Sequence, residues 1–201
     1  MRRDRAAWMA VVLAGAALGT ATVAADAAPA AEARGTARSG THTTACPTGW
    51  GSLDKTRVAG TTTPVEDVGT GRHACFDRLV VHVPGARAGD LGHFVRYVGR
   101  LHQDGSGRPI AVGGGAVLEV RVAAPGYRPE TGAPTYPGRA GRPLPGVDLT
   151  GYRTFRDARF AGSFEGETQI GLGVRGRLPF RVLALDGRVV VDVAHTWSGA
   201  R

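Results

Sequence analysis

The sequence predicts an all-β domain of many short strands, arranged as a sandwich or a barrel. Apolar residues recur with a period of two in several segments, as expected for strands that bury one face. Gly-rich turn signals separate these segments at short intervals. No segment carries a sustained period of 3.6 residues, which is the pattern of an amphipathic helix.

The N-terminus predicts export from the cell. Residues 1–5 hold three arginines, residues 6–18 form a short apolar run, and Ala25-Asp26-Ala27 fits a small-residue cleavage pattern. Together these features are typical of a signal peptide, which we predict over residues 1–27. The alternative is a retained anchor, but a membrane span needs about 20 predominantly apolar residues. We therefore expect a secreted or wall-associated protein, with no transmembrane segment in the mature chain.

The next segment predicts a disordered linker over residues 28–45. It consists mostly of Ala, Thr, Gly, Ser and Arg and has no Phe, Tyr or Trp. Such a segment buries too little apolar surface to offset the entropy lost on ordering. We expect the folded domain to cover residues 46–201, a common size for one domain with its own core.

Cys46 and Cys75 are the only cysteines in the chain. In an exported protein an even pair predicts a disulfide. The alternatives are two free thiols or a metal pair, although no CxxC spacing supports a zinc site.

The predicted strands follow one another along the domain. Two β-branched runs are typical of central strands, and four further segments alternate or are otherwise strand-like. The six segments are Leu79–Val83, Phe94–Leu101, Leu118–Val122, Ile170–Val174, Phe180–Val182 and Val189–Val193. Asp186-Gly187 predicts a tight hairpin, and Asp104–Gly107 predicts a hairpin with a longer loop. Gly113–Gly115 interrupts the strand pattern before the next segment. Gly162–Gly166 is interpreted as a tight connection.

One long Pro/Gly-rich loop is predicted over residues 125–151, which contain six prolines. A connection of this length without secondary structure is uncommon and is often functional or disordered. We expect a mobile excursion from the domain that contains one short helical turn.

The net charge of +8 comes almost entirely from arginine, with Lys55 the only lysine. Outside the cell, a basic surface suits anionic wall polymers, peptidoglycan carboxylates or anionic lipid headgroups. Nucleic acid is the weaker interpretation, because no nucleic-acid-binding motif is present and the arginines are scattered. We expect no nucleic-acid partner.

No pattern of catalytic residues stands out. His73, His82 and His195 lie near carboxylates in the sequence, a combination found in metal sites and acid–base pairs. Asp192 and His195 would point to opposite faces of one strand unless the strand ends between them. No GxSxG nucleophile motif is present. We expect no catalytic residue, no metal site and no cofactor.

Several segments, in their order along the chain, resemble the AMIN-like domain family of secreted and lipid-anchored actinobacterial proteins. The segments are Cys46–Ser52, Gly71–Arg78, Gly162–Gly166, Gly171–Gly173, Phe180–Val182 and Val190–His195. The family is distantly similar to the AMIN domain of cell-wall amidases. The resemblance implies a small β-sandwich of two mainly antiparallel sheets. It also implies a module that associates with peptidoglycan and has no catalytic activity of its own.

The sequence therefore predicts a non-catalytic module that binds peptidoglycan or another cell-wall polymer. Arginine forks suit carboxylates and aromatic rings stack on sugars. The candidate ligand-binding residues are Trp50, Arg78, Arg96, Tyr97, Arg121, Phe164 and Arg181. Asp77 with Arg78, and Asp192 with His195, are interpreted as groups that hold the fold. Two alternatives stay open: an adaptor for another exported protein, and a small metal-dependent or acid–base hydrolase.

Overall fold

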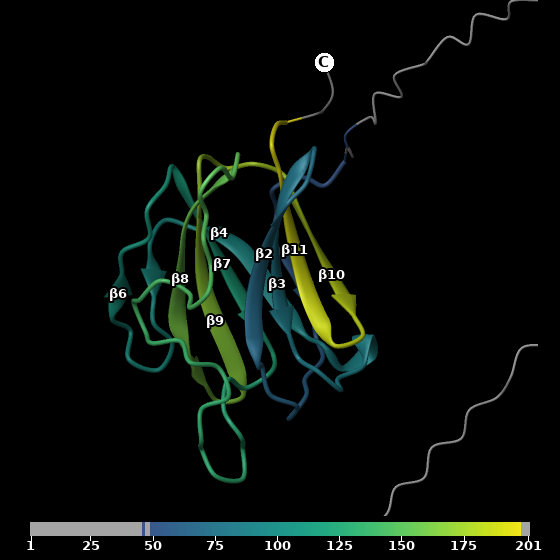
Figure 1. The fold of residues 1–201 in the computed structure, drawn as a ribbon, viewed down its shortest axis with the longest axis vertical. Coiled ribbons are helices and arrows are strands. Elements are labelled where there is room, and N and C mark those ends of the chain that lie inside the picture. The colour runs from purple at the N-terminus through teal and green to yellow at the C-terminus, as the bar shows by residue number, and fades with distance from the viewer. Residues whose placement is uncertain (1–45, 47–48, 198–201) are drawn as a thin grey trace, which may run out of the picture. The chain divides into compact units, whose positions relative to one another are not determined.

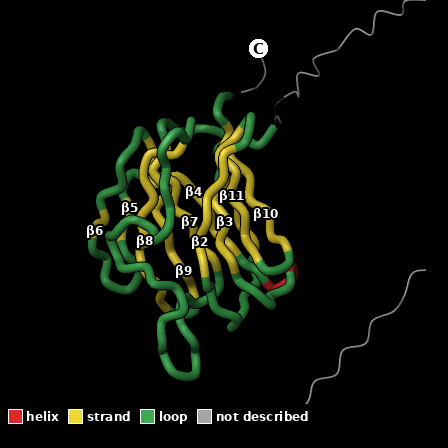
Figure 2. The backbone as a smooth tube through the Cα atoms, in the orientation of Figure 1, coloured by secondary structure: helices red, strands yellow, loops and turns green. Residues whose placement is uncertain are grey.

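The computed structural model describes residues 46 and 49–197, which form two antiparallel sheets packed face to face (Figure 1). The predicted signal peptide and linker, residues 1–45, lie outside the described residues. Helical structure within the described part of the chain is limited to one 3-10 turn, η1 (Ala88–Asp90), as Figure 2 shows. The predicted all-β sandwich is confirmed.

The larger sheet has five strands in the order β1-β4-β7-β9-β8. Their bounds are β1 (Lys55–Arg57), β4 (His93–Val98), β7 (Ala116–Val122), β9 (Glu167–Val174) and β8 (Phe155–Phe164). The smaller sheet has four strands in the order β10-β11-β3-β2. Their bounds are β10 (Phe180–Leu185), β11 (Arg188–Ala194), β3 (Phe76–His82) and β2 (Asp67–Arg72). Every neighbouring pair in both sheets is antiparallel.

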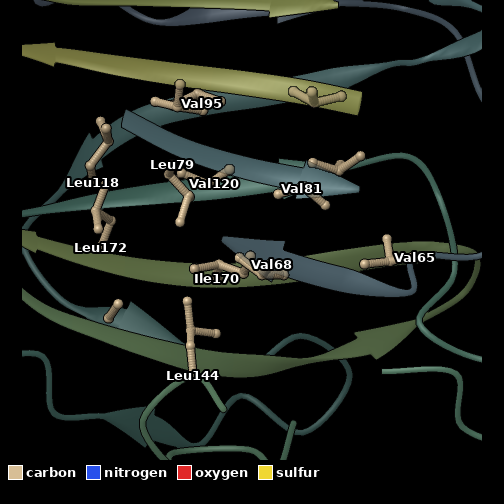
Figure 3. Close-up of a cluster of buried hydrophobic side chains, with 14 of the residues drawn as sticks. Val65, Val68, Leu79, Val81, Val95, Leu118, Val120, Leu144, Ile170 and Leu172 are labelled. Atoms are coloured by element: carbon tan, nitrogen blue, oxygen red, sulfur yellow. The ribbon is translucent and has the colours of Figure 1, made fainter. Parts of the chain in front are cut away.

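The core lies between the two sheets because their strands alternate inward and outward. On β3, Leu79 and Val81 are fully buried and their neighbours are partly exposed. They pack with inward residues of the five-stranded sheet, including Leu118, Val120 and Ile170 (Figure 3). Burial of this continuous apolar layer is the main stabilising term of the sandwich.

A small third sheet covers part of the outer face of the five-stranded sheet. It pairs β5 (Leu101–His102) with β6 (Pro109–Ile110), which confirms the hairpin predicted around Asp104–Gly107. Leu101 packs with Ile110 and Ala161 in a second apolar cluster. Gly171 on β9 makes this approach possible, because a Cβ atom there would lie 2.3 Å from the Leu101 side chain.

The six predicted segments all correspond to strands, although their bounds differ by up to three residues and Phe94–Leu101 is divided into β4 and β5. The prediction missed β1, β2 and β8. In β8 the register shifts between Phe155 and Asp157 and again between Phe160 and Gly162, which interrupts the period of two. The segment Gly162–Gly166 is therefore the end of β8 followed by the β8–β9 turn, where Glu165 and Gly166 have positive φ angles of 48° and 81°.

The Pro/Gly-rich segment 125–151 forms no strand and no helical turn, so the expected helical turn is wrong. Part of the segment packs against the sandwich. Tyr136 and Leu144 are buried, and the amide N–H groups of Gly141 and Leu144 donate to the carbonyl oxygens of Phe160 and Ala158 at 2.8 and 3.0 Å. The segment therefore covers the outer edge of β8, which would otherwise present unpaired backbone groups.

Candidate functional site

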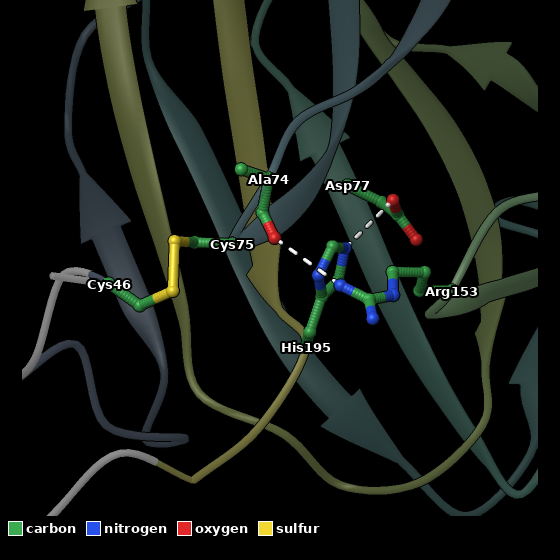
Figure 4. The surroundings of a disulfide bond; sticks show 6 residues. All are labelled: Cys46, Ala74, Cys75, Asp77, Arg153 and His195. Atoms are coloured by element: carbon green, nitrogen blue, oxygen red, sulfur yellow. Dashed lines mark hydrogen bonds and ion pairs between the residues drawn. A yellow bond between two sulfur atoms is a disulfide. The ribbon is translucent and has the colours of Figure 1, made fainter. Parts of the chain in front are cut away.

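The predicted disulfide between Cys46 and Cys75 is confirmed, with a Cα–Cα distance of 5.3 Å (Figure 4). It attaches the start of the described chain to the residue that precedes β3. The carbonyl oxygen of Cys75 in turn accepts a hydrogen bond from the amide of His195 at 2.9 Å. The disulfide thus lies at the end of the sandwich where β3 begins and β11 ends.

Three of the predicted ligand-binding residues, Trp50, Arg78 and Arg181, meet on the outer face of the four-stranded sheet. The two arginines share one carboxylate partner. Asp192 on β11 lies directly opposite Arg78 on β3 and Arg181 on β10. Arg78 donates to both carboxylate oxygens of Asp192 at 2.6 and 2.9 Å, and Arg181 donates to Oδ2 at 2.8 Å. These hydrogen bonds to Asp192 raise the pKa of Arg78. Asp192 is fully buried although it belongs to the outer face.

Aromatic rings cover the two arginines. The Arg181 guanidinium lies 4.5 Å from the ring centroid of Trp50, and the Arg78 guanidinium lies 5.2 Å from that of Phe76. The two rings are 5.6 Å apart and tilted to each other. Cation–π contacts of this kind fix the guanidinium planes in position. We call Trp50, Phe76, Arg78, Arg181 and Asp192 the arginine–aromatic cluster.

The arginine–aromatic cluster has groups that can bind a further carboxylate. Two guanidiniums face one carboxylate, so one positive charge remains uncompensated within the cluster. The side chains of Arg78 and Arg181 stay 27% and 34% exposed, which leaves N–H donors accessible from solvent. Guanidinium N–H groups bind carboxylates in a fixed geometry.

Phe76 is a member of the arginine–aromatic cluster that the sequence analysis missed. The alternation along β3 carried the signal, because residues 76 and 78 lie on the same face of a strand. The predicted strand began only at Leu79, so Phe76 lay outside it.

Three other candidates lie on the outer face of the five-stranded sheet, away from the cluster. Arg96 on β4 donates to Glu119 at 2.9 Å, and Arg121 on β7 pairs with Glu167 at 3.0 Å and with Asp104. Phe164 is 45% exposed, and its ring lies against Gly105 in the β5–β6 loop. The structure does not bring these three residues together with Trp50, Arg78 and Arg181.

Tyr97 packs at the margin of the core between the sheets. Its hydroxyl donates to the carbonyl oxygen of Leu178 at 2.8 Å and accepts from the amide of Leu178 at 3.0 Å. Burial raises the pKa of Tyr97 to about 12. The phenol thus ties β4 to the chain before β10, and its hydroxyl is already engaged by the backbone.

The two buried aspartates have each other's expected partners: the sequence groups Asp77 with Arg78, and Asp192 with His195. Asp77 faces inward on β3 and pairs with His195, whose Nε2 lies 3.1 Å from Oδ1 of Asp77. Asp192 faces outward and pairs with Arg78 and Arg181. The physical reason is the alternation of side chains along β11, because residues three positions apart point to opposite faces, and His195 continues this alternation just beyond the end of the strand at Ala194.

The remaining histidines of the sequence analysis do not converge. His73 stacks on Phe76 with ring centroids 4.4 Å apart, and His82 lies next to Gly69 near the opposite end of β3. Over residues 46 and 49–197, no group of three or more His, Cys, Asp or Glu side chains is placed to hold a metal ion. Within the same residues, no helix has the length and apolar character needed to cross a bilayer.

Comparison with known proteins gives one result. The family model of the AMIN-like domain matches residues 63–195, so Cys46 and Trp50 lie outside the matched range. No curated protein matches the chain, and no solved structure matches it. Since the match covers most of the sequence and nearly the whole sandwich, the chain belongs to the AMIN-like domain family.

Proposed function

We propose that this protein is an exported, non-catalytic module that binds a polymer of the cell envelope, with peptidoglycan as the foremost ligand. The family supports a role at the cell wall. The Cys46–Cys75 disulfide supports a location outside the cytoplasm, because disulfides persist in oxidising compartments.

The observation that carries the proposal is the arginine–aromatic cluster. Arg181 lies 4.5 Å from the ring centroid of Trp50 while it hydrogen-bonds to the buried Asp192. A carboxylate of the stem peptide or of an acidic sugar binds the remaining guanidinium N–H groups, and the exposed parts of the aromatic rings contact the sugar. Asp192 and the cation–π contacts hold the donors in place before the ligand arrives, which lowers the entropic cost of binding.

An acidic polymer fits this surface better than a folded protein partner does. The Pro/Gly-rich segment 125–151 covers the edge of β8 with its own backbone hydrogen bonds, so this edge is not free to pair with a strand of a protein partner. The cluster carries two guanidiniums on one carboxylate, and a carboxylate-bearing polymer neutralises the remaining positive charge. An adaptor role remains the second candidate and is an outcome of the test below.

The test is co-sedimentation of the protein, expressed from its full sequence, with purified peptidoglycan before and after removal of attached wall polymers. Each preparation is assayed at low and at high salt. We expect retention on bare peptidoglycan at both salt concentrations, because a hydrogen-bonded arginine site is less sensitive to screening than a diffuse charge. Binding that disappears at high salt would assign the effect to net charge alone. Absence of binding under all conditions would overturn the proposal in favour of the adaptor role.

A further inference from the structure

A second group of arginines lies at the end of the sandwich next to the disulfide. A pocket of about 410 Å³ is lined there by Arg153, which precedes β8, by Arg156, the second residue of β8, and by Arg175, which follows β9. His195 and Thr196, which follow β11, complete its lining. We call these five residues the arginine pocket. Its side chains come from three separate parts of the chain, and the fold brings them together.

Two of the three arginines are held in place by neutral backbone groups. Arg156 donates to the carbonyl oxygens of Tyr152 and Phe155 at 3.1 and 2.9 Å, and Arg175 donates to the carbonyl oxygen of His195. Among the described residues, Arg153, Arg156 and Arg175 form no salt bridge with a carboxylate. The pocket therefore carries the positive charges of three arginines, and no carboxylate of the described residues forms a salt bridge with them.

The carboxylate that contacts His195 points into the interior of the domain. Asp77 is fully buried, and its Oδ2 accepts the amide N–H groups of Thr154 and Phe155 at 2.5 and 3.3 Å. Its Oδ1 faces Nε2 of His195 (Figure 4). Asp77 thus orients the imidazole ring of His195, and its one salt bridge among the described residues is with that histidine and not with an arginine.

His195 supplies an independent sign that the pocket receives a ligand. Its side chain is 8% exposed, and its second ring nitrogen, Nδ1, is buried without a hydrogen-bond partner. A buried polar atom normally has a partner, so this one calls for an explanation. Arg153, in the same pocket, is exposed, and its one hydrogen bond, to the carbonyl oxygen of Ala74, is 3.5 Å long.

Positive charge continues beyond the arginine pocket. An adjacent pocket of about 370 Å³ is lined by Arg72, His73 and Gly151 together with Arg153 and Asp77. Gly151 has a φ of +78°, and a Cβ atom there would lie 2.8 Å from Nη1 of Arg72. The glycine thus allows the Arg72 guanidinium to lie directly against the loop beside Arg153.

We propose that the arginine pocket is a binding site for an oxyanion, the carboxylate or phosphate group of a ligand. Arg153, Arg156 and Arg175 surround the anion, and His195, whose Nε2 is engaged by Asp77, offers Nδ1 to an anion oxygen. Charge-assisted hydrogen bonds of this kind are short and strong. The site is distinct from the arginine–aromatic cluster, since Asp77 and Arg78 face opposite sides of β3, and it does not depend on wall binding.

The test is a titration of the protein with inorganic phosphate, and separately with acetate, followed by NMR of backbone amides and arginine Nε–H groups. Sodium chloride keeps the ionic strength constant. We expect saturable shifts at Arg153, Arg175 and His195 with at least one of the two anions, and the stronger of the two identifies the preferred group. Linear shifts spread over all exposed arginines would overturn the proposal.

Two variants make the test specific. Arg153→Gln removes one guanidinium whose only hydrogen bond is the long contact with Ala74, so we expect it to fold and to bind the anion about fivefold or more weakly. Arg188→Gln removes the same charge from an exposed arginine at the opposite end of β11 and should leave the affinity unchanged. Equal affinities for the two variants would contradict the proposal, whatever the result with peptidoglycan.

Discussion

Asp77 and His195 are 118 positions apart in the chain, yet Nε2 of His195 lies 3.1 Å from Oδ1 of Asp77 in the interior. The other oxygen of Asp77 accepts the amide N–H groups of Thr154 and Phe155. One carboxylate therefore connects β3 in one sheet, the start of β8 in the other sheet and the residue that follows β11.

Replacement of this carboxylate should destabilise the fold strongly. Asp77→Ala leaves two buried amides and the imidazole without an acceptor, so we expect the free energy of unfolding to fall by about 3–5 kcal/mol. Urea unfolding followed by circular dichroism measures the change. Asp90→Ala, at an exposed position in η1, is the control and should change stability by less than about 0.5 kcal/mol. Similar small effects for both variants would show that Asp77 has no such role.

Reduction of the disulfide should destabilise the same end of the sandwich. Cys46 and Cys75 are separated by 29 positions, and closing a loop of this length stabilises a fold by about 3–4 kcal/mol in the chain-entropy model. We expect the Cys46→Ser/Cys75→Ser double variant to lose about this amount in urea unfolding. Addition of a reductant should lower the unfolding midpoint of the wild-type protein but not that of the double variant. A wild-type midpoint that is insensitive to reduction would contradict this account.

The close approach of Gly113 to β9 depends on the absence of a side chain at Gly173. A Cβ atom at this position would lie 1.8 Å from the carbonyl oxygen of Gly113. We expect Gly173→Ala to cost about 1–3 kcal/mol, because the backbone has to move to relieve the overlap. Gly176→Ala, whose Cβ atom would have no neighbour within 4 Å, is the matched control and should be nearly neutral in thermal unfolding. The account is wrong if the two substitutions have equal effects.

Stability should fall in mild acid because of His93 on β4. Burial, with a smaller effect of the nearby Arg57 charge, lowers the pKa of His93 from its ordinary value of 6.5. The unfolded chain therefore binds a proton at this site more tightly than the folded chain does. The stability that His93 contributes is complete above pH 6.5 and is lost as the pH falls toward the lowered pKa.

The measurement is the free energy of urea unfolding between pH 8 and pH 5 for the wild type and for His93→Gln. The slope below pH 6.5 should be smaller in the variant. His102→Gln, at an exposed position in β5, serves as the comparison and should keep the wild-type slope. Parallel curves for the wild type and His93→Gln would remove His93 as the cause.

The sequence predicted the elements whose period of two is uninterrupted. Leu118–Val122 and Ile170–Val174 show this pattern clearly, and both lie within strands. β8 escaped prediction because two register shifts move its apolar residues from one face to the other. The grouping of Arg78 and Arg181 around Asp192 depends on the register of three neighbouring strands, which the sequence of each strand does not contain. The arginine pocket depends in the same way on three distant segments.

The most direct test of the central claim, that the arginine–aromatic cluster binds the cell wall, is the affinity of the full protein for soluble peptidoglycan fragments at fixed ionic strength. Wild type, Arg181→Gln, Arg181→Lys and Arg188→Gln are compared, after circular dichroism has shown that each is folded. We predict that Arg181→Gln weakens binding about tenfold or more and that Arg181→Lys recovers only part of it, because lysine lacks the guanidinium fork. Arg188→Gln should bind as the wild type does. Equal losses for Arg181→Gln and Arg188→Gln, or no loss for either, would contradict the account.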